Sequence, residues 1–425
     1  MFVSFFPKPK LFFISAVVWG LALVVLWFAW AKGFGTTIGM GPPDPNAPPI
    51  LTPVVFLTPE YLWFYLYFAA GVLAFYLAWR LYSPHPWQNW SILVSALILF
   101  ATNFSVQVSV VLNVWRGAFF DMVQRALTPP PGSVSAGDLF NGVVQFIMLA
   151  GVYMFIAVLN VFVVRHYIFR WRTAMHDYFT THWQKLRHIE GASQRVQDDT
   201  MRFSQTMQGL GLSFVDSVMT LIAFLPLLAG LSVHVSELPF VGEIPYPLVT
   251  AAVCWSLFGT LLLAIVGIKL PGLEFKNQRV EAALRKELVY GEDDSARADP
   301  ITLKELFTNV RKNYFRLYAH YVYFDVTRYL YLQTDNVFAL LILTPTIALG
   351  RITFGIFQQI LSAFSQVSSS FQYLVNSWPT IVELLSIYKR LRAFEAVLEG
   401  EALPEIDRKY LERRAEGAAE AEIAT

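Results

Sequence analysis

Three glutamates in the stretch LEFKNQRVEAALRKELVYGEDD have the spacing of a proton relay. On a helix, Glu274, Glu281 and Glu292 share one face within about 20°, with Arg285 among them. The helical rise puts the first two about 10 Å apart and the outer two about 27 Å apart, so water would have to bridge them. Two alternatives stay open: Gly291 would end the helix before Glu292, or Glu281 and Arg285 would form an ordinary i,i+4 ion pair.

Two further carboxylates, Asp216 and Asp335, fall inside apolar runs. An ionised side chain in a membrane span costs roughly 3 kcal/mol on insertion scales, so such residues are usually functional. Arg328 precedes Asp335 by seven residues and shares its helix face. A buried carboxylate with a raised pKa can carry a proton, and the alternative is a structural bond to a neighbouring helix. Asp216 and Asp335 therefore join the three glutamates as proton-coupling candidates.

A stripe of polar residues follows the last apolar run of the chain. Its members are spaced three, four, three, four and three residues apart, so they lie along one side of a helix. They are Gln359, Ser362, Gln366, Ser369, Tyr373 and Asn376. Polar contacts between helices explain shorter runs. We interpret this stripe as the wall of a hydrated cavity large enough for a peptide, with interhelical contacts as the alternative.

The elements that must position these residues are helices in a membrane. Apolar residues make up 55% of the 425 residues and charged residues only 15%, and the mean hydropathy is +0.47, a composition typical of integral membrane proteins. A hydrocarbon core of about 30 Å requires roughly 20 apolar residues in a helix. Eight stretches qualify: 11–31, 61–79, 90–115, 140–164, 210–233, 247–268, 323–349 and 352–377. We therefore expect an all-α integral membrane protein with eight transmembrane helices.

The basic residues indicate the orientation of these helices. Cytoplasmic loops carry an excess of Lys and Arg. If the N-terminus is cytoplasmic, only four basic residues fall outside, namely Lys32, Arg116, Arg125 and Arg351. The sequence therefore predicts that both termini are cytoplasmic.

The loops suggest how the spans are grouped. Residues 1–82 form a two-span N-terminal extension, and residues 83–400 form six spans with long inner loops at 165–208 and 269–321. This layout resembles the transmembrane domain of an ABC exporter, as an analogy of topology only. The charged tail, residues 401–425, is expected to be disordered.

Several kinds of site find no support in the sequence. No G-x-x-x-x-G-K-[ST] phosphate-binding loop occurs, and only about fifty residues follow the last apolar run, so we expect no nucleotide-binding domain in this chain. The energy would come from a separate ATPase subunit or from another source. The histidines lack the spacing of metal ligands, and no cofactor, nucleophile motif or nucleic-acid module is expected.

Five segments of the chain resemble a known family. The resemblance covers nearly the whole chain except the outer loops and the tail. The five segments are MFVSFFPKPK, EGASQRVQDDTMRF, LEFKNQRVEAALRKELVYGEDD, VRKNYFRLY and FQYLVNSWPTIVELLSIYKRLRAFE, in this order. The chain thereby resembles the SbmA/BacA family of peptide uptake transporters. The resemblance implies a homodimer in the bacterial inner membrane, with an ABC-exporter-like fold that lacks the ATPase. It also implies that the proton gradient drives the import of peptides and peptide-like antibiotics.

The resemblance also orders the candidate residues. Matching VEA and YGE by position points to Glu281 and Glu292 as proton-coupling residues, with Tyr290 beside them, and Glu274 and Glu287 are weaker candidates. The family carries an acid near the position of Gln208, which cannot titrate, so that part of a relay is either missing or has moved to Asp216.

Three functions remain open at this stage. The first is a proton-driven peptide importer, and the second is an ABC permease half with a separate ATPase. The third is a structural protein of the membrane, which the long polar stripe disfavours.

Overall fold

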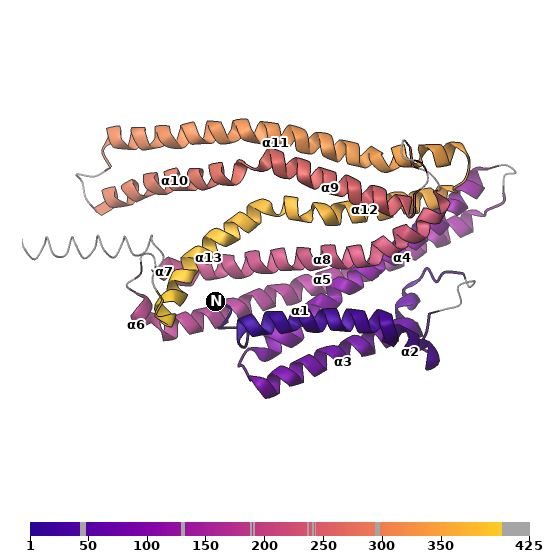
Figure 1. The fold of residues 1–425 in the computed structure, drawn as a ribbon, viewed down its shortest axis with the longest axis horizontal. Helices are drawn as coiled ribbons and strands as arrows, with labels where there is room; N and C mark the ends of the chain where they lie inside the picture. Colours follow the sequence, from indigo (N-terminus) through magenta and orange to yellow (C-terminus); the bar gives the residue numbers. More distant parts are fainter. Residues whose placement is uncertain are drawn as a thin grey trace, which may run out of the picture. The chain divides into compact units, whose positions relative to one another are not determined.

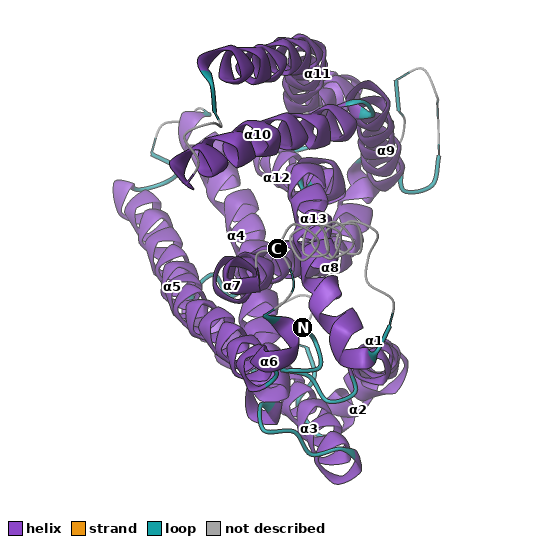
Figure 2. Ribbon diagram, turned by 90° about the vertical axis from the view of Figure 1, so that its left-hand side faces the viewer, coloured by secondary structure: helices purple, strands orange, loops and turns teal. Residues whose placement is uncertain are grey.

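The computed structural model describes residues 1–42, 48–128, 132–187, 189, 192–235, 238–239, 242, 244–293 and 298–401. Within these ranges the regular structure is helical, apart from one isolated bridge between Leu238 and Gly242 (Figure 2). The predicted all-α fold is therefore confirmed. Most of the tail, which was expected to be disordered, lies outside the described residues.

The chain forms two compact units, Met1–Met219 with Glu383–Thr425, and Thr220–Val382. The first unit contains α1 (Pro9–Leu26), η1 (Trp27–Ala31), α2 (Lys32–Thr37), η2 (Pro53–Leu57), α3 (Pro59–Tyr82), η3 (Asn89–Val94), α4 (Ser95–Leu127), α5 (Ala136–Thr181), α6 (Trp183–Leu186), α7 (Ala192–Gln194) and η4 (Arg195–Asp199). The second contains η5 (Ser232–His234), α9 (Pro247–Gly267), α10 (Leu270–Asp293), α11 (Pro300–Ala348) and α12 (Phe354–Asn376). The boundaries fall inside α8 (Thr200–Leu231) and α13 (Trp378–Glu399). The predicted division into residues 1–82, 83–400 and 401–425 stays a prediction.

Six helices of the described chain are long and apolar enough to cross a membrane. They are Pro9–Thr37, Pro59–Tyr82, Asn89–Leu127, Ala136–Thr181, Ala192–His234 and Pro247–Glu274, and each contains one of the first six predicted spans. The predicted spans at 323–349 and 352–377 are also helical, in α11 and α12. These two carry more charged or polar residues than the other six, so their composition alone does not identify them as spans.

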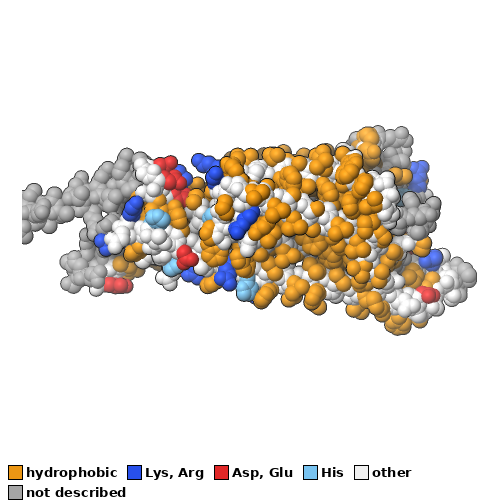
Figure 3. Space-filling model, turned by 90° about the horizontal axis from the view of Figure 1, so that it is seen from below, with side chains coloured by type: hydrophobic (Ala, Val, Ile, Leu, Met, Phe, Trp, Pro, Cys, Tyr) orange, Lys and Arg blue, Asp and Glu red, His pale blue; other side chains and the backbone are white. Residues whose placement is uncertain are grey.

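The hydrophobic side chains of the spans remain accessible on the surface. Figure 3 shows a broad area of apolar side chains on one face of the molecule, with Lys and Arg side chains gathered toward one end of it. Leu66, Phe155 and Leu261 are examples of large apolar side chains that are more than half exposed. Surfaces of this kind are stable against lipid rather than water.

In the first unit, side-chain donors of α3 hold α1 by its backbone. The phenol of Tyr67 donates to the carbonyl of Leu23 at 2.7 Å, and the Trp19 indole of α1 donates in return to the carbonyl of Gly71 at 3.0 Å. A Cβ at Gly71 would lie 2.7 Å from a methyl carbon of Leu23, so glycine permits the close approach of the two helices. Helices α1 and α3 therefore form a packed helical hairpin.

The segment before α1 is packed against the C-terminal part of α5 and the N-terminal end of α8. The ring of Phe5 stacks on Trp171 at 5.8 Å, and Phe2 contacts Phe203 edge to face at 5.5 Å. Met1, Phe5 and Phe203 are at most 1% exposed. These rings form the core of the first unit outside the apolar spans.

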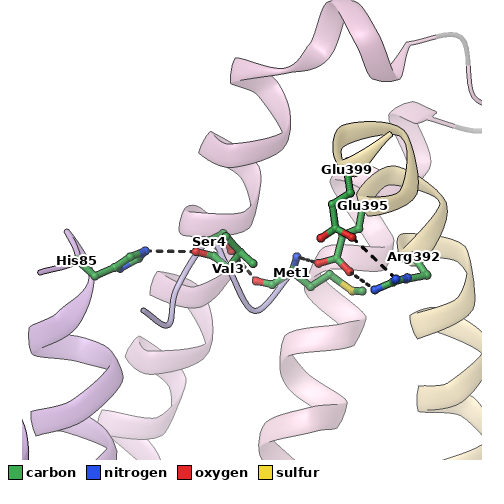
Figure 4. A network of polar contacts seen from close by, with 7 residues as sticks. All are labelled: Met1, Val3, Ser4, His85, Arg392, Glu395 and Glu399. Carbon is green, nitrogen blue, oxygen red and sulfur yellow. Dashed lines mark hydrogen bonds and ion pairs between the residues drawn. The ribbon is translucent and has the colours of Figure 1, made fainter. Parts of the chain in front are cut away.

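A polar network fixes the same segment to α13 and to the chain after α3 (Figure 4). The Met1 ammonium forms an ion pair with Glu395, whose other oxygen lies 3.7 Å from Arg392. Burial lowers the pKa of the Met1 amine, and the charge of Glu395 opposes this shift. On the other side, Nε2 of His85 is 3.2 Å from the carbonyl oxygen of Val3.

In the second unit, α10 and α11 form an antiparallel hairpin, and α9, α11 and α12 pack together (Figure 1). Helix α11 has 49 residues, so it is roughly 70 Å long and more than twice the thickness of a hydrocarbon core. Asp299 caps it by accepting from the backbone N–H of Ile301 at 3.2 Å. The segment 269–321, predicted as a long inner loop, therefore consists largely of α10 and the first turns of α11.

Candidate functional site

Asp335 lies on α11 where this helix meets α9 and α12. Its Oδ1 accepts a hydrogen bond from the indole Nε1–H of Trp255 at 2.8 Å. The same oxygen accepts from the hydroxyl of Ser368 at 2.9 Å. Three helices therefore converge on one carboxylate oxygen within a predicted span.

Aromatic rings surround this carboxylate. The indole of Trp255 stacks on Phe338 with centroids 4.0 Å apart and an angle of 13°. On the other side, it stacks on Tyr331 at 5.4 Å and 24°. The amide of Gln372 donates to the Tyr331 hydroxyl and to the Ser368 hydroxyl, each at 3.2 Å. Tyr331, Ser368 and Gln372 are each at least 93% buried.

Helical spacing explains why these residues meet. Tyr331 and Asp335 are four residues apart on α11, and Ser368 and Gln372 are four apart on α12, so each pair lies on one helix face. On α9, Gly259 follows Trp255 by four residues, and a Cβ at Gly259 would lie 2.0 Å from Cζ of Tyr331. The glycine therefore allows α9 to approach α11 closely enough for the indole to reach the carboxylate.

The hydrogen-bond partners of Asp335 are neutral side chains. Within the described residues Asp335 forms no ion pair, and Arg328 does not contact it as the sequence suggested. An aspartate held by an indole and a hydroxyl can be neutralised without leaving a buried cation unpaired. Asp335 as a whole is half-buried.

The polar stripe lies on the accessible side of α12. Opposite it, Ile360, Ala363, Phe364 and Val367 are at most 2% exposed. Every predicted member of the stripe remains half-buried or exposed, namely Gln359, Ser362, Gln366, Ser369, Tyr373 and Asn376. Helix α12 is thus amphipathic, with its apolar side packed within the second unit. An accessible polar side on a helix at membrane depth requires water or polar partners.

The predicted glutamate ladder lies on α10, which runs unbroken through Gly291 to Asp293. The phenol of Tyr314, on α11, donates to Oε1 of Glu281 at 2.5 Å. This hydrogen bond is the main reason that the pKa of Tyr314 is raised. Arg285 is exposed and forms no ion pair with Glu281, so the i,i+4 alternative does not occur. The first and last acids of the predicted ladder, Glu274 and Glu292, are half-buried and exposed, respectively.

Buried amides support the hairpin one turn from Glu281. The side-chain amide of Asn313 donates to Oδ1 of Asn277 at 3.2 Å, and both residues are 5% exposed. At the far end, Glu287 accepts from the backbone N–H of Ala298 at 3.2 Å. These bonds make the hairpin an ordered scaffold for the glutamates.

The remaining candidates are placed separately. Asp216 is an exposed residue of α8 and belongs to the first unit. The side chain of Tyr290 lies outside the described residues. Among the predicted proton-coupling residues, Asp335 and Glu281 have side-chain hydrogen-bond partners in the described part of the chain, and both belong to the second unit.

Sequence reasoning missed four residues of the Asp335 network: Trp255, Tyr331, Ser368 and Gln372. The only signal for them was the i,i+4 spacing within α11 and within α12. Nothing in the local sequence paired Trp255 with an aspartate 80 residues away.

These features define a class of protein, a multi-pass helical membrane protein with an aromatic-lined carboxylate between three of its helices. The chain belongs to the SbmA/BacA-like family, whose model matches residues 84–399. The family resemblance read from the sequence is thereby confirmed.

Curated relatives agree with a role in transport. The chain is 24% identical over 335 residues to the Inner membrane ABC transporter ATP-binding protein YddA of Escherichia coli (strain K12), a match that covers 73% of this chain and 58% of the relative. An uncharacterized ABC transporter ATP-binding protein of Synechocystis is 22% identical over 80% of this chain and 51% of its own length. The chloroplastic ABC transporter D family member 2 of Arabidopsis thaliana is 24% identical, over 56% of this chain and 35% of its own.

The chain spans about half the length of the curated relatives it matches. Together, the family and these relatives identify a membrane transporter. Two of these relatives are named as ATP-binding proteins, whereas the 425 residues contain no G-x-x-x-x-G-K-[ST] sequence. The source of energy is therefore the central question about function.

Proposed function

We propose that this protein imports peptides, including antimicrobial peptides and peptide-like antibiotics, across the bacterial inner membrane and is driven by the proton gradient. The proposal includes eight spans, with α11 and α12 contributing the last two, both termini in the cytoplasm, and a homodimer as the working unit. The observation that carries it is Asp335, which lies within a predicted span and is held by Trp255 and Ser368, with no cation paired to it in the described part of the chain.

In the proposed mechanism, protonation of Asp335 changes the strength of the bonds that join α9, α11 and α12. Hydrogen bonds to an ionised acceptor are roughly twice as strong as neutral ones. Neutralising Asp335 weakens its two bonds to Trp255 and Ser368 and thereby favours a different packing of the three helices. Protonation then acts as a ligand that shifts a conformational equilibrium.

The accessible polar side of α12 supplies the proposed wall for the peptide. Peptide backbone groups need hydrogen-bond partners wherever water is excluded. Gln359 and Gln366 each offer a donor and an acceptor, and Tyr373 adds a hydroxyl. Because Ser368 and Gln372 lie on the buried side of the same helix, a rotation of α12 would change the carboxylate network and the wall together.

Glu281 is the proposed second proton site, at the α10–α11 hairpin. Its bond to Tyr314 spans the two helices, so a change in its charge alters their contact. A Glu281→Gln substitution keeps an oxygen that accepts from Tyr314 but removes the titratable group. We expect this variant to fold normally and to lose uptake driven by a pH gradient, as measured with a labelled peptide in proteoliposomes.

One specific observation favours a second function, a permease half that works with an ATPase. The curated relatives are named as ATP-binding proteins, and the match covers about half of their length. The two functions differ in what the purified chain can do alone. In vesicles with the membrane potential clamped at zero and without nucleotide, a proton-driven importer accumulates peptide under an inward pH gradient. A permease half does so only when an ATPase and ATP are added.

A further inference from the structure

An apolar cavity in the first unit lies apart from the residues assigned to transport. Its volume is about 520 Å³, within the range of small-molecule sites. The side chains of α1, α3, α4, α5 and α8 line it, and most of them are aliphatic or aromatic. On α1 the lining runs from Phe12 to Leu23, a rise of about 16 Å and close to the depth of one leaflet.

Two buried donors in this lining have no partner. Oγ of Ser91 and Nε1 of Trp171 make no hydrogen bond, although these residues are only 1% and 4% exposed. A buried polar group without a partner costs free energy, so such groups usually have an unseen ligand or water. The cavity therefore holds two unused donors in an otherwise apolar setting.

Helical register indicates that the two donors lie near each other, on the paired segments η3 and α5. Helices α4 and α5 are consecutive and pack against each other in opposite directions. One turn deeper, Ser95 donates to the Tyr167 hydroxyl at 2.9 Å. Ser91 precedes Ser95 by four residues, and Trp171 follows Tyr167 by four, so the register places Ser91 opposite Trp171. Ser91 also lies in the π-helical turn η3, and such turns are frequent at functional sites.

Cations lie at the same end of the cavity as the two donors. Lys8 precedes the lining residue Phe12 by one helical turn, and its Nζ lies 4.2 Å from the ring centre of Tyr82. The guanidinium of Arg170, next to Trp171, lies 5.4 Å from the ring of Trp90. Both cations are exposed, and neither forms an ion pair within the part of the chain that the structure describes.

The wall formed by α1 is open to the surroundings. Val17 and Trp19 line the cavity and are 62% and 38% exposed. An occupant can therefore enter sideways from the bilayer. A peptide would bring backbone polar groups for which this lining has few partners. A hydrocarbon chain requires none.

We propose that this cavity binds one acyl chain of an anionic phospholipid from the leaflet at the N-terminal end of α1. An ester carbonyl oxygen of the lipid accepts from Ser91 and Trp171, and its phosphate lies near Lys8 and Arg170. The two donors then match the ester group of the lipid, the cations match its phosphate, and the apolar cavity, one leaflet deep, matches its acyl chain. The bound lipid would fill the space between the N-terminal hairpin and the helices α4, α5 and α8.

The test uses the full chain in vesicles of phosphatidylethanolamine that contain a minority of phosphatidylglycerol with a photoactivatable acyl chain. After irradiation, mass spectrometry locates the adducts. We expect them on the lining of α1 and α8, near Gly20 and Leu212. Adducts spread evenly over the lipid-facing surface would overturn the proposal, and so would displacement of the probe by a transported peptide.

Two kinds of variant distinguish labelling inside the cavity from labelling of the general lipid-facing surface. A Cβ at Gly20 or at Gly151 meets no atom within 4 Å, but only Gly20 lines the cavity. We expect Gly20→Phe to reduce adducts on the lining by about tenfold and Gly151→Phe to leave them unchanged. The double variant Ser91→Ala with Trp171→Phe keeps the space open and should reduce phosphatidylglycerol adducts roughly tenfold or more. Wild-type labelling in both lining variants would refute the assignment.

Discussion

Replacing Asp335 by asparagine separates the proposed proton function from the structural role of this residue. Asparagine keeps an Oδ1 that accepts from Trp255 and Ser368, so the three helices remain joined. Bonds to an ionised acceptor contribute about 1.5–3 kcal/mol and neutral ones about 0.5–1.5 kcal/mol. The two bonds together would then lose about 2 kcal/mol if the aspartate is ionised, a moderate loss of stability. Asparagine, in contrast, has no carboxyl group and cannot bind the proton.

The assay is uptake of a labelled peptide by proteoliposomes under an inward pH gradient with the potential clamped. We expect Asp335→Asn to fall to the level of protein-free vesicles while its thermal unfolding shifts by only a few degrees, as a loss of about 2 kcal/mol implies. Trp255→Phe serves as the matched control. It keeps a ring to stack on Phe338 and leaves the carboxyl group and the bond from Ser368, but removes one of the two bonds, so it should retain part of the gradient-driven uptake. Wild-type uptake by Asp335→Asn would refute the reasoning.

Two further predictions concern packing and pH. Gly259→Ala should destabilise the protein by roughly 1–3 kcal/mol because the new Cβ clashes with Tyr331, whereas Gly151→Ala places its Cβ in open space and should be neutral or stabilising. Thermal unfolding of the two variants side by side measures this difference. Equal stability of the two variants would contradict the prediction. Burial lowers the pKa of His85, so the stability that its neutral form contributes is present above its usual pKa of about 6.5 and is lost as the pH falls through the lower folded-state value. Acidification should therefore break the bond that Nδ1 of His85 accepts from the backbone N–H of Trp87 at 3.2 Å, which hydrogen exchange at this amide would detect, and His85→Gln should remove this pH dependence.

The helical elements were predictable because lipid imposes a simple rule on sequence. Long apolar runs give the first six spans, and each lies within a helix of matching position. The last two are less clear because Asp335 in α11 and the polar stripe of α12 lower the hydropathy of these segments. The features that suggest function are the same ones that weaken the signal of a membrane span.

The polar side of α12 was predictable from periodicity, but the side of α12 that packs against other helices was not. The spacing of Gln366 and Ser369 places them on one helix face, and the structure leaves both accessible. Ser368 and Gln372, four residues apart, also share a helix face and lie on the buried side. Helical spacing defines which residues share a face and cannot say which face meets another helix.

The partners of the acids depend on tertiary contacts that local sequence does not contain. Glu281 has Arg285 one turn away and bonds to Tyr314 instead, 33 residues along the chain. Asp335 has Arg328 on its own helix and is held by Trp255 of α9. In both cases a neighbouring helix supplies a neutral donor in place of the cation that local spacing suggested. This substitution is what makes the two acids candidates for protonation.

The most direct test of the proposed mechanism is peptide-driven proton movement. Proteoliposomes that contain the purified chain and an internal pH indicator, without nucleotide and with no initial pH gradient, receive peptide on the outside while the potential is clamped. Proton coupling predicts that peptide entry acidifies the interior in the wild type and that Asp335→Asn shows no such signal. Peptide entry with no change in internal pH would contradict it.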